Sequence, residues 1–198
     1  MEIAPRGAAE QPLFVAGGAV SVRQVRADDV SMLTQLLLRL SPRSCHQRYL
    51  AVRAFTPESA RAEAERIAAA RTRHHIALVA VAPRPGSDEL VGVAELARLD
   101  EAAGLGELGL IVRDDMQRAG VGSLLLAALR AAALQLGLDT LQMDVLAGNM
   151  AMRRLAAYLG APSVRWMGDG VVQLRVELAE VGQRRLSYPA EPAPRRAA

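Results

Sequence analysis

Aromatic residues and cysteine are both scarce in this 198-residue chain. Phe, Trp and Tyr make up only 3% of the residues, so the core must be built from aliphatic side chains and Met. Few rings are then available for stacking on nucleic-acid bases. The single cysteine, Cys45, excludes an internal disulfide and fits a reducing compartment. A net charge of +3 is modest, and several arginines lie near the C-terminus, so the charge alone does not indicate a nucleic-acid partner.

Long apolar runs are also missing. No segment is long enough to span a bilayer. The first residues lack a secretory pattern, because Glu2, Pro5, Glu10 and Pro12 interrupt them. We therefore expect a cytoplasmic monomer or homodimer with no membrane or nucleic-acid partner. The length suits one domain with a substantial core.

Turn and capping signals divide the chain into strands and helices. Residues 1–19 and 182–198 have the composition of flexible tails, which leaves one domain over residues 20–181. Within it, periodicity predicts a strand, two or three helices, three strands, a helix, a strand, a helix and two strands. The predicted strands cover 20–25, 75–82, 89–99, 104–112, 141–146, 163–167 and 171–178. The predicted helices cover 28–40, a short stretch after residue 41, 57–70, 123–136 and 149–159.

The most informative stretch is Gln117-Arg118-Ala119-Gly120-Val121-Gly122. It follows an apolar strand and opens a helix that continues through Ser123. The backbone N–H groups of residues 118–123 are therefore expected at the positive end of a helix, where they favour a bound phosphate. Gly120 and Gly122 carry no Cβ, so the backbone can approach a ligand closely there.

This loop resembles the pyrophosphate loop of the GNAT superfamily of acyl-CoA-dependent N-acetyltransferases, and Gln117, Gly120 and Gly122 match its register. Residues 143–149 and the helix that follows resemble the family's next strand, its Asn and its helix. The resemblance covers about residues 20–179. It implies an α/β (α+β) fold: a mixed, mostly antiparallel sheet of about seven strands, flanked by helices and splayed at a groove for acetyl-CoA.

The resemblance also implies which residues bind acetyl-CoA. In this family, backbone groups at the end of the strand before the loop bind the pantetheine amide and the acetyl carbonyl. By register those groups belong to Leu110, Ile111 and Val112. Asn149 either bonds the cofactor or caps the helix that follows it.

Two glutamates compete for the role of general base. Glu107 stands in an apolar run on the strand before the loop. Some lysine acetyltransferases of the GNAT superfamily place a catalytic Glu near this point. Burial there would favour the protonated form and suit a base near neutral pH. The alternative is an exposed Glu at the start of a strand. Glu95, on the preceding strand, is the second candidate base.

The tyrosine that commonly protonates the leaving thiolate in GNAT enzymes has no counterpart. Its position, seven residues after Asn149, is Ala156. Tyr158 lies two residues further on and is predicted about 200° away around the helix. It is therefore a weak candidate acid, and solvent or the amine's own proton is the alternative.

Neighbouring residues of ligand type do not predict a metal site. His74 and His75 would point to opposite faces of a strand. Cys45 and His46 would point about 100° apart on a helix. We expect no metal cofactor.

A shorter resemblance concerns the acceptor. The segment Leu40-Ser41-Pro42-Arg43-Ser44, followed by Arg48-Tyr49-Leu50, is similar to one in Pat-type bacterial protein lysine acetyltransferases, which carry Glu in place of Arg43. The resemblance implies an acetyl-CoA-dependent N-acetyltransferase acting on a protein lysine or a small-molecule amine. A non-catalytic acyl-CoA sensor, favoured by Ala156, and a basic nucleic-acid-binding protein, which rests only on the arginines, stay open as alternatives.

Overall fold

The computed structural model describes residues 13–15, 18–100 and 104–178 of the chain. These residues form one sheet in the order β1-β2-β3-β4-β5-β6-β8-β7, in which only the pairing of β5 with β6 is parallel. The mixed, mostly antiparallel sheet confirms the predicted fold class. The strands are β1 (Leu13–Val15), β2 (Gly18–Gln24), β3 (His75–Ala82), β4 (Glu89–Asp100), β5 (Leu105–Val112), β6 (Thr140–Leu146), β7 (Ser163–Gly168) and β8 (Val171–Glu177).

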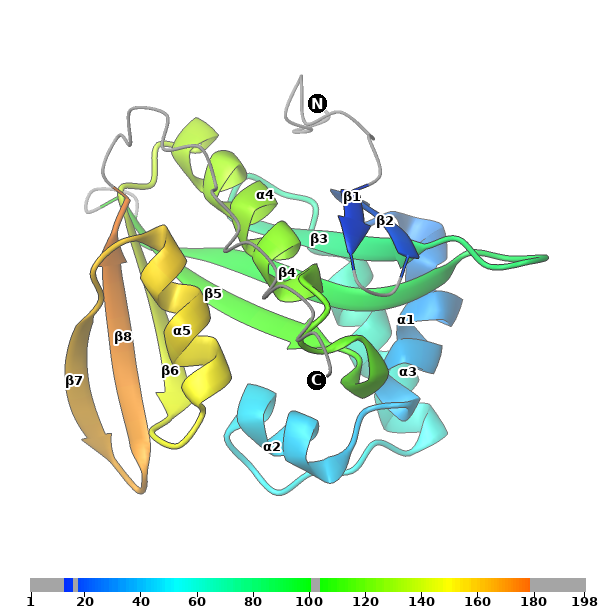
Figure 1. Cartoon of the computed structure of the whole chain (residues 1–198), viewed down its shortest axis with the longest axis horizontal. Helices are drawn as coiled ribbons and strands as arrows, with labels where there is room; N and C mark the ends of the chain where they lie inside the picture. Colours follow the sequence, from blue (N-terminus) through cyan, green and yellow to red (C-terminus); the bar gives the residue numbers. More distant parts are fainter. Residues whose placement is uncertain (1–12, 16–17, 101–103, 179–198) are drawn as a thin grey trace, which may run out of the picture.

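Helices cover both faces of this sheet (Figure 1). Helices α4 and α5 pack on one face, α1 and α3 on the other, and α2 lies across one end. No helix in the described residues is long and apolar enough to cross a membrane. The helices are η1 (Ala27–Asp29), α1 (Val30–Leu38), α2 (Pro42–Tyr49), α3 (Pro57–Ala68), η2 (Asp114–Met116), α4 (Val121–Gln135) and α5 (Met150–Leu159).

Capping residues determine where α2 and α3 begin. The Ser41 hydroxyl accepts a hydrogen bond from the Ser44 N–H at 3.2 Å, and Pro42 occupies the first turn of α2. Thr56 caps α3 in the same way by accepting from the Ser59 N–H at 3.2 Å. A side-chain cap replaces one missing intrahelical acceptor, and proline costs nothing where no N–H is required. Both helix starts were predicted from these signals and are confirmed.

Two aliphatic cores lie on either side of β3. Alternate residues such as Ile76 and Leu78 face α4 and α5, while Ala77 and Val79 face α1 and α3. Complete burial of one such aliphatic side chain stabilises the fold by roughly 1.5–3 kcal/mol. The central strand reads as a continuous apolar run because both of its faces are buried.

The N-terminal boundary differs from the prediction. Strand β1 and the first residues of β2 fall within residues 1–19, which were expected to form a flexible tail. They pair in antiparallel register from Leu13↔Val20 to Val15↔Gly18 and add an eighth strand. A strand of three residues has too little alternation for its sequence to predict it. The predicted C-terminal tail, residues 182–198, lies outside the described residues.

The sheet opens between β5 and β6. These strands pair only from Leu105↔Thr140 to Glu107↔Gln142. Beyond that point β5 continues to pair with β4 as far as Val112, and β6 pairs with β8 instead. The predicted splay between the two strands is confirmed. The opening is wide at the C-terminal end of β5, and the chain continues from there through η2 to the N-terminus of α4.

Candidate active site

The glycine loop makes the turn from β5 into α4 with left-handed backbone. Gly120 has a φ of 95° and Arg118 a φ of 62°. Glycine adopts such angles without steric cost because it lacks a Cβ. The first N–H groups of α4, which begins at Val121, have no acceptor one turn earlier in the helix. This end of the opening therefore offers unpaired donors and a positive dipole, which fit a phosphate group.

Gly122 has a packing role that its motif position did not predict. A Cβ at this position would lie 3.1 Å from Cδ1 of Leu155 in α5 and 3.7 Å from Cδ2 of Leu110. This packing role stands beside the expectation that the backbone at Gly122 can approach a ligand closely, which stays a prediction. The missing side chain at Gly122 lets α4 pack closely on α5.

Backbone groups of β5 alternate between β4 and the opening. The Arg113 N–H donates to the Val91 carbonyl at 2.9 Å, continuing the β4–β5 ladder. Because antiparallel strands alternate, Ile111 directs its N–H and C=O to β4, whereas Leu110 and Val112 direct theirs to the open side. The structure thus corrects the proposed cofactor contact at Ile111, whose backbone groups belong to the ladder. Leu110 has the orientation expected of a cofactor contact.

Gln117 and Asp114 tie α2 to the end of β5. Gln117 Nε2 donates to the Val112 carbonyl at 3.1 Å and to the Ser44 hydroxyl at 3.0 Å. Asp114 accepts from the Ser41 N–H at 2.9 Å and from the Ser41 and Ser44 hydroxyls at 2.7 and 2.8 Å. Burial would raise the pKa of Asp114, but these hydrogen bonds lower it. The Leu-Ser-Pro-Arg-Ser segment is thereby anchored beside the opening.

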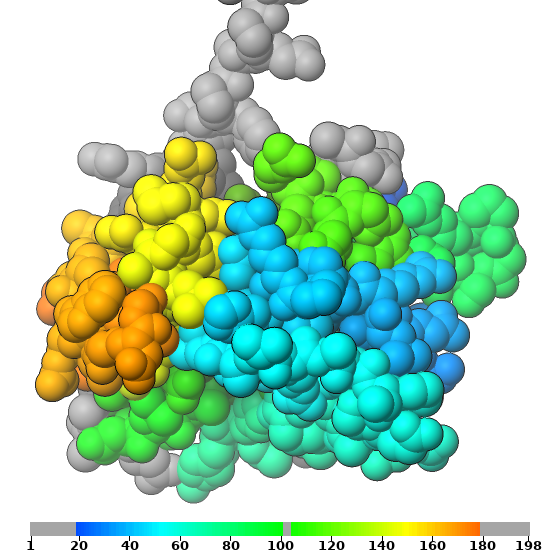
Figure 2. All heavy atoms as spheres, turned by 90° about the horizontal axis from the view of Figure 1, so that it is seen from below, coloured from blue at the N-terminus to red at the C-terminus, as the bar shows by residue number. Residues whose placement is uncertain are grey.

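A pocket of about 370 Å³ lies on the α2 and α3 side of the sheet, at the closed end of the opening. In Figure 2 the residues of α2 and the segment after it (blue to cyan) occupy the middle of the lower face, with the β7–β8 hairpin (orange) to one side. Both candidate bases contribute to this pocket. Its lining residues are Arg48, Tyr49, Arg53, Glu63, Arg66, His75, Glu95, Ala97, Glu107 and Gly109.

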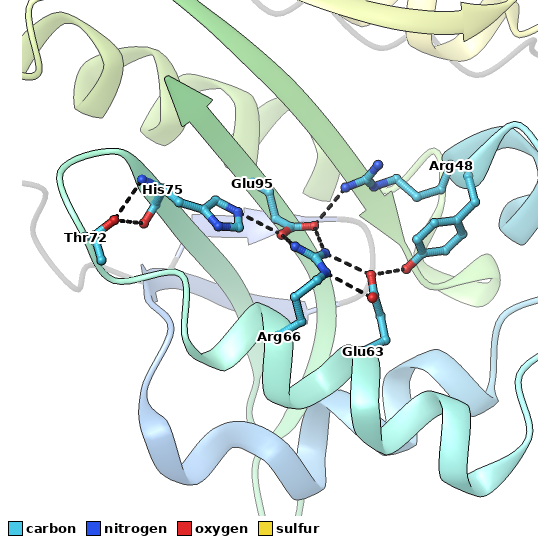
Figure 3. Close-up of polar contacts among 7 residues, drawn as sticks. Arg48, Glu63, Arg66, Thr72, His75 and Glu95 are labelled. Atoms are coloured by element: carbon cyan, nitrogen blue, oxygen red, sulfur yellow. Dashed lines mark hydrogen bonds and ion pairs between the residues drawn. The ribbon is translucent and has the colours of Figure 1, made fainter. Parts of the chain in front are cut away.

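Glu95 is buried and is contacted by two arginines and a histidine (Figure 3). Arg66 in α3 binds it with both terminal nitrogens, Nη1 to Oε1 at 2.9 Å and Nη2 to Oε2 at 3.0 Å. Arg48 in α2 donates to Oε2 at 2.8 Å, and His75 Nε2 lies 3.2 Å from Oε1. Arg66 also binds Glu63, which accepts a hydrogen bond from the Tyr49 hydroxyl at 3.1 Å. Glu95 thus holds α2, α3 and β3 together.

This environment makes Glu95 a weak base. Burial by itself would raise the pKa of Glu95, but the hydrogen bonds from His75 and Arg66 and the charges of Arg48 and Arg66 lower it to about 2. A carboxylate with so low a pKa has little tendency to accept a proton at neutral pH. The structure therefore favours a structural role for Glu95, the second candidate base, in holding α2 and α3 against the sheet.

Glu107 has the opposite environment. Its side chain is exposed, so the expectation that burial tunes it is wrong. Residue 107 pairs with Ala97 of β4 and with Gln142 of β6, at the last position before β5 and β6 part. Within the part of the chain that the structure describes, no cation lies within ion-pairing distance of this carboxylate. The Glu107 carboxylate therefore lies unpaired by the described residues at the closed end of the opening.

Comparison with known proteins agrees with this arrangement. A family model described as an acetyltransferase (GNAT) domain matches residues 20–162. The chain belongs to the GNAT acetyltransferase family.

Individual proteins that are similar to this GNAT chain include named acetyltransferases. It is 36% identical over 92 residues to the acetyltransferase Pat of Mycolicibacterium smegmatis, a match that spans 46% of the chain but only 27% of that protein. The GNAT domain of S. lividans PAT superposes with a TM-score of 0.73 at 23% identity, over 88% of the chain and 99% of that domain. The yncA protein of Salmonella typhimurium, solved with its cofactor acetyl-CoA, has a TM-score of 0.59 at 18% identity, over 85% and 99%.

Helix α5 of this GNAT chain carries the remaining candidates. Asn149 caps the helix, its Oδ1 accepting from the Met152 N–H at 3.1 Å, and is buried. Ala156 is fully buried, whereas Tyr158 is 69% exposed. The predicted divergence of these two positions is confirmed. Tyr158 as catalytic acid has no support from the geometry.

The sequence did not predict that Arg48 and Arg66 bind Glu95, or that Gly109 leaves room for the Arg48 side chain. The Arg48 side chain crosses β5 over Gly109, where a Cβ would lie only 2.5 Å from its Cζ. Arg48 Nε is buried there without a hydrogen-bond partner. The lone signal was a glycine inside a strand, which often marks close approach by another group. Over the described residues of this GNAT chain, no three His, Cys, Asp or Glu residues are placed to hold a metal ion.

Proposed function

We propose that this chain is an acetyl-CoA-dependent N-acetyltransferase that transfers the acetyl group directly to an amine, either a protein lysine or a small molecule. The observation that carries the proposal is the opening between β5 and β6, which has a phosphate-type helix N-terminus at its wide end and a pocket with an unpaired carboxylate at its closed end.

The residues along the opening fit acetyl-CoA. The N–H groups of residues 118–123 receive the pyrophosphate, and Arg118 adds a positive charge. The Leu110 backbone receives the pantetheine amide, while Asn149 orders the first turn of α5 across the opening. From Glu107 to Val112 the strand spans about 17 Å, so an extended ligand is required to connect the two ends. Acetyl-CoA supplies an activated thioester to the closed end.

Glu107 acts there as general base. It takes a proton from the acceptor ammonium, directly or through a water, so that the amine nitrogen can attack the thioester carbonyl. The C–N bond forms, the C–S bond breaks, and the nitrogen loses its second proton to solvent as the amide forms. The leaving thiolate takes a proton from solvent, since Ala156 replaces the tyrosine and Tyr158 faces away. Positioned general-base catalysis contributes roughly 10²–10⁴-fold in rate.

Charge reversal in the loop tests the cofactor site. Arg118 is exposed and makes no ion pair with the described residues, so Arg118→Glu should fold normally. A carboxylate beside the pyrophosphate should weaken acetyl-CoA binding by about tenfold or more. Isothermal titration calorimetry gives the affinity. Arg71→Glu, an exposed substitution at the opposite end of the sheet before β3, is the matched control and should bind as the wild type does. Equal affinity in both variants would contradict the loop assignment.

A non-catalytic acyl-CoA sensor is distinguished by turnover. Free CoA release should be measured with amines, amino acids and lysine peptides as acceptors. Acetyl-CoA binding without turnover of any amine would favour the sensor over the transferase.

A further inference from the structure

The charges that line the pocket do not all cancel within the protein. Glu95 is bound by Arg48, Arg66 and His75, and Glu63 is bound by Arg66. Two charged side chains of the lining are left over. Arg53 and Glu107 form no ion pair or hydrogen bond with any residue that the structure describes.

Arg53 is held in place by aromatic rings rather than by an anion. Its Cζ lies 4.5 Å from the centre of the Tyr49 ring and 4.3 Å from the centre of the Phe55 ring. The two rings themselves meet edge to face, with centroids 5.6 Å apart. Cation–π contacts restrict the guanidinium but use none of its N–H donors. Only 3% of the residues in this chain are aromatic, yet two of its five Phe and Tyr side chains contact this one arginine.

An unpaired guanidinium that lines a pocket is suited to a planar anion. Its forked N–H groups match both oxygens of a carboxylate, and hydrogen bonds between two charged groups are the strongest that side chains make. Glu107, which lines the same pocket, is suited to an ammonium group. The pocket therefore complements a molecule that carries one charge of each sign.

We propose that the acceptor is a free amino acid or a zwitterion of similar size, with its carboxylate on Arg53 and its amine at Glu107. This inference rests on the proposed transferase function and names the substrate class of the same site. A pocket of about 370 Å³ lies at the lower end of the range for small-molecule sites, which fits one such molecule. A lysine within a protein chain carries the side-chain amine, but its own carboxyl group is part of a peptide bond.

Paired acceptors test the carboxylate. Each proteinogenic L-amino acid is compared with its α-carboxamide, and a blocked peptide with an internal lysine forms the third arm. CoA release gives kcat/KM for each. With the wild type, at least one free amino acid should be a substrate, and its carboxamide should be poorer by about tenfold or more, because the charged hydrogen bonds to Arg53 are lost.

Variants of Arg53 assign that preference to one residue. Arg53→Met should raise KM for the free acid and bring the ratio of acid to carboxamide close to one. Arg53→Lys, which keeps the charge but loses the fork, should fall in between. The ratio is measured within each variant, so it does not depend on how much of the variant folds. Acetyl-CoA affinity should stay at the wild-type value. Arg61→Met, at an arginine on α3 whose side chain is 72% exposed, should keep the wild-type ratio.

The outcomes separate this inference from the function on which it rests. A wild-type ratio near one, or a ratio unchanged in Arg53→Met, overturns the carboxylate site. Turnover of the lysine peptide alone overturns the inference and leaves the transferase intact. Acetyl-CoA binding with no turnover in any arm overturns both.

Discussion

The two ends of the β5–β6 opening are built in different ways. The wide end is one continuous stretch, residues 117–123, whose backbone offers the unpaired N–H groups of a helix N-terminus. The closed end takes side chains from α2, α3, β3, β4 and β5, and partners such as Arg48 and Glu95 are 47 residues apart in sequence. A cofactor common to a family is suited to backbone recognition, which tolerates side-chain change. An acceptor that varies between relatives is suited to side chains, which can be exchanged one at a time.

The comparison is sharpest for the two glutamates. Glu107→Gln keeps the shape and removes the base, so kcat should fall by about 10²-fold or more. The rising limb of the pH profile of kcat/KM should vanish or move. Acetyl-CoA affinity should stay within about twofold, since the change lies at the other end of the opening.

A matched control is Glu65→Gln, an exposed substitution on α3 whose partner Arg61 is exposed too. It should leave kcat unchanged. Full activity in Glu107→Gln would remove Glu107 from the mechanism and return the role of base to Glu95 or to solvent.

Glu95→Gln should act on stability with a defined dependence on pH. The folded-state pKa of about 2 is depressed from an ordinary value of 4.5. The stabilisation is therefore fully present above pH 4.5 and is lost as the pH falls through 2. It amounts to about 3 kcal/mol in the free energy of unfolding. Denaturant unfolding of wild type and variant should show a gap of this order at pH 7 that narrows below pH 4.5. A gap independent of pH would contradict the role of Glu95 as an ion-paired carboxylate.

Gly109→Ala should lower stability by displacing the Arg48 side chain that binds Glu95. A methyl group at this position overlaps the Arg48 guanidinium, which must leave Glu95 to make room. We expect a loss of about 1–2 kcal/mol of stability, because overpacking and a broken buried contact combine. In an Arg48→Ala background the same substitution should cost less than about 0.5 kcal/mol. Equal costs in the two backgrounds, measured as a double-mutant cycle, would show that Arg48 does not depend on this glycine.

Tyr158→Phe should have the smallest effect. The side chain is 69% exposed on α5, and Ala156 occupies the buried position. Steady-state kcat and KM should stay within about twofold of wild type, a difference of roughly 0.4 kcal/mol in the barrier. A large loss of kcat would mean that the ring moves toward the thiolate on substrate binding.

The parts of the fold and of the candidate site that could be predicted are those set by signals within a few residues of sequence. Caps such as Ser41 and Thr56, the alternation in β3, and the glycine loop each lie within a few residues, where local physics decides the conformation. The two glutamates could not be ranked in this way. Both stand in apolar strands, and they lie on the same face of the sheet, because Glu95 pairs with Gly109 and Glu107 with Ala97.

The difference between the glutamates comes from tertiary packing. Glu95 lies where Arg66, 29 residues away, reaches it from α3. Glu107 lies on the next strand, opposite Ala97, which is two residues along β4 from Glu95. The backbone direction at Ile111 and the packing role of Gly122 could not be predicted for a related reason. Which way a backbone group points, and which helix a missing Cβ faces, depends on the neighbouring strand and helix rather than on the motif.

Amide hydrogens along the last part of β5 differ in what shields them from solvent. The Ile111 N–H is held by β4, whereas the Leu110 N–H faces the opening. In the free protein, deuterium would therefore replace the Leu110 amide hydrogen much sooner than its neighbour's. A molecule lying in the opening would protect Leu110 and leave Ile111 as it was. Two adjacent residues of one strand thus form an internal gauge of whether the groove is occupied.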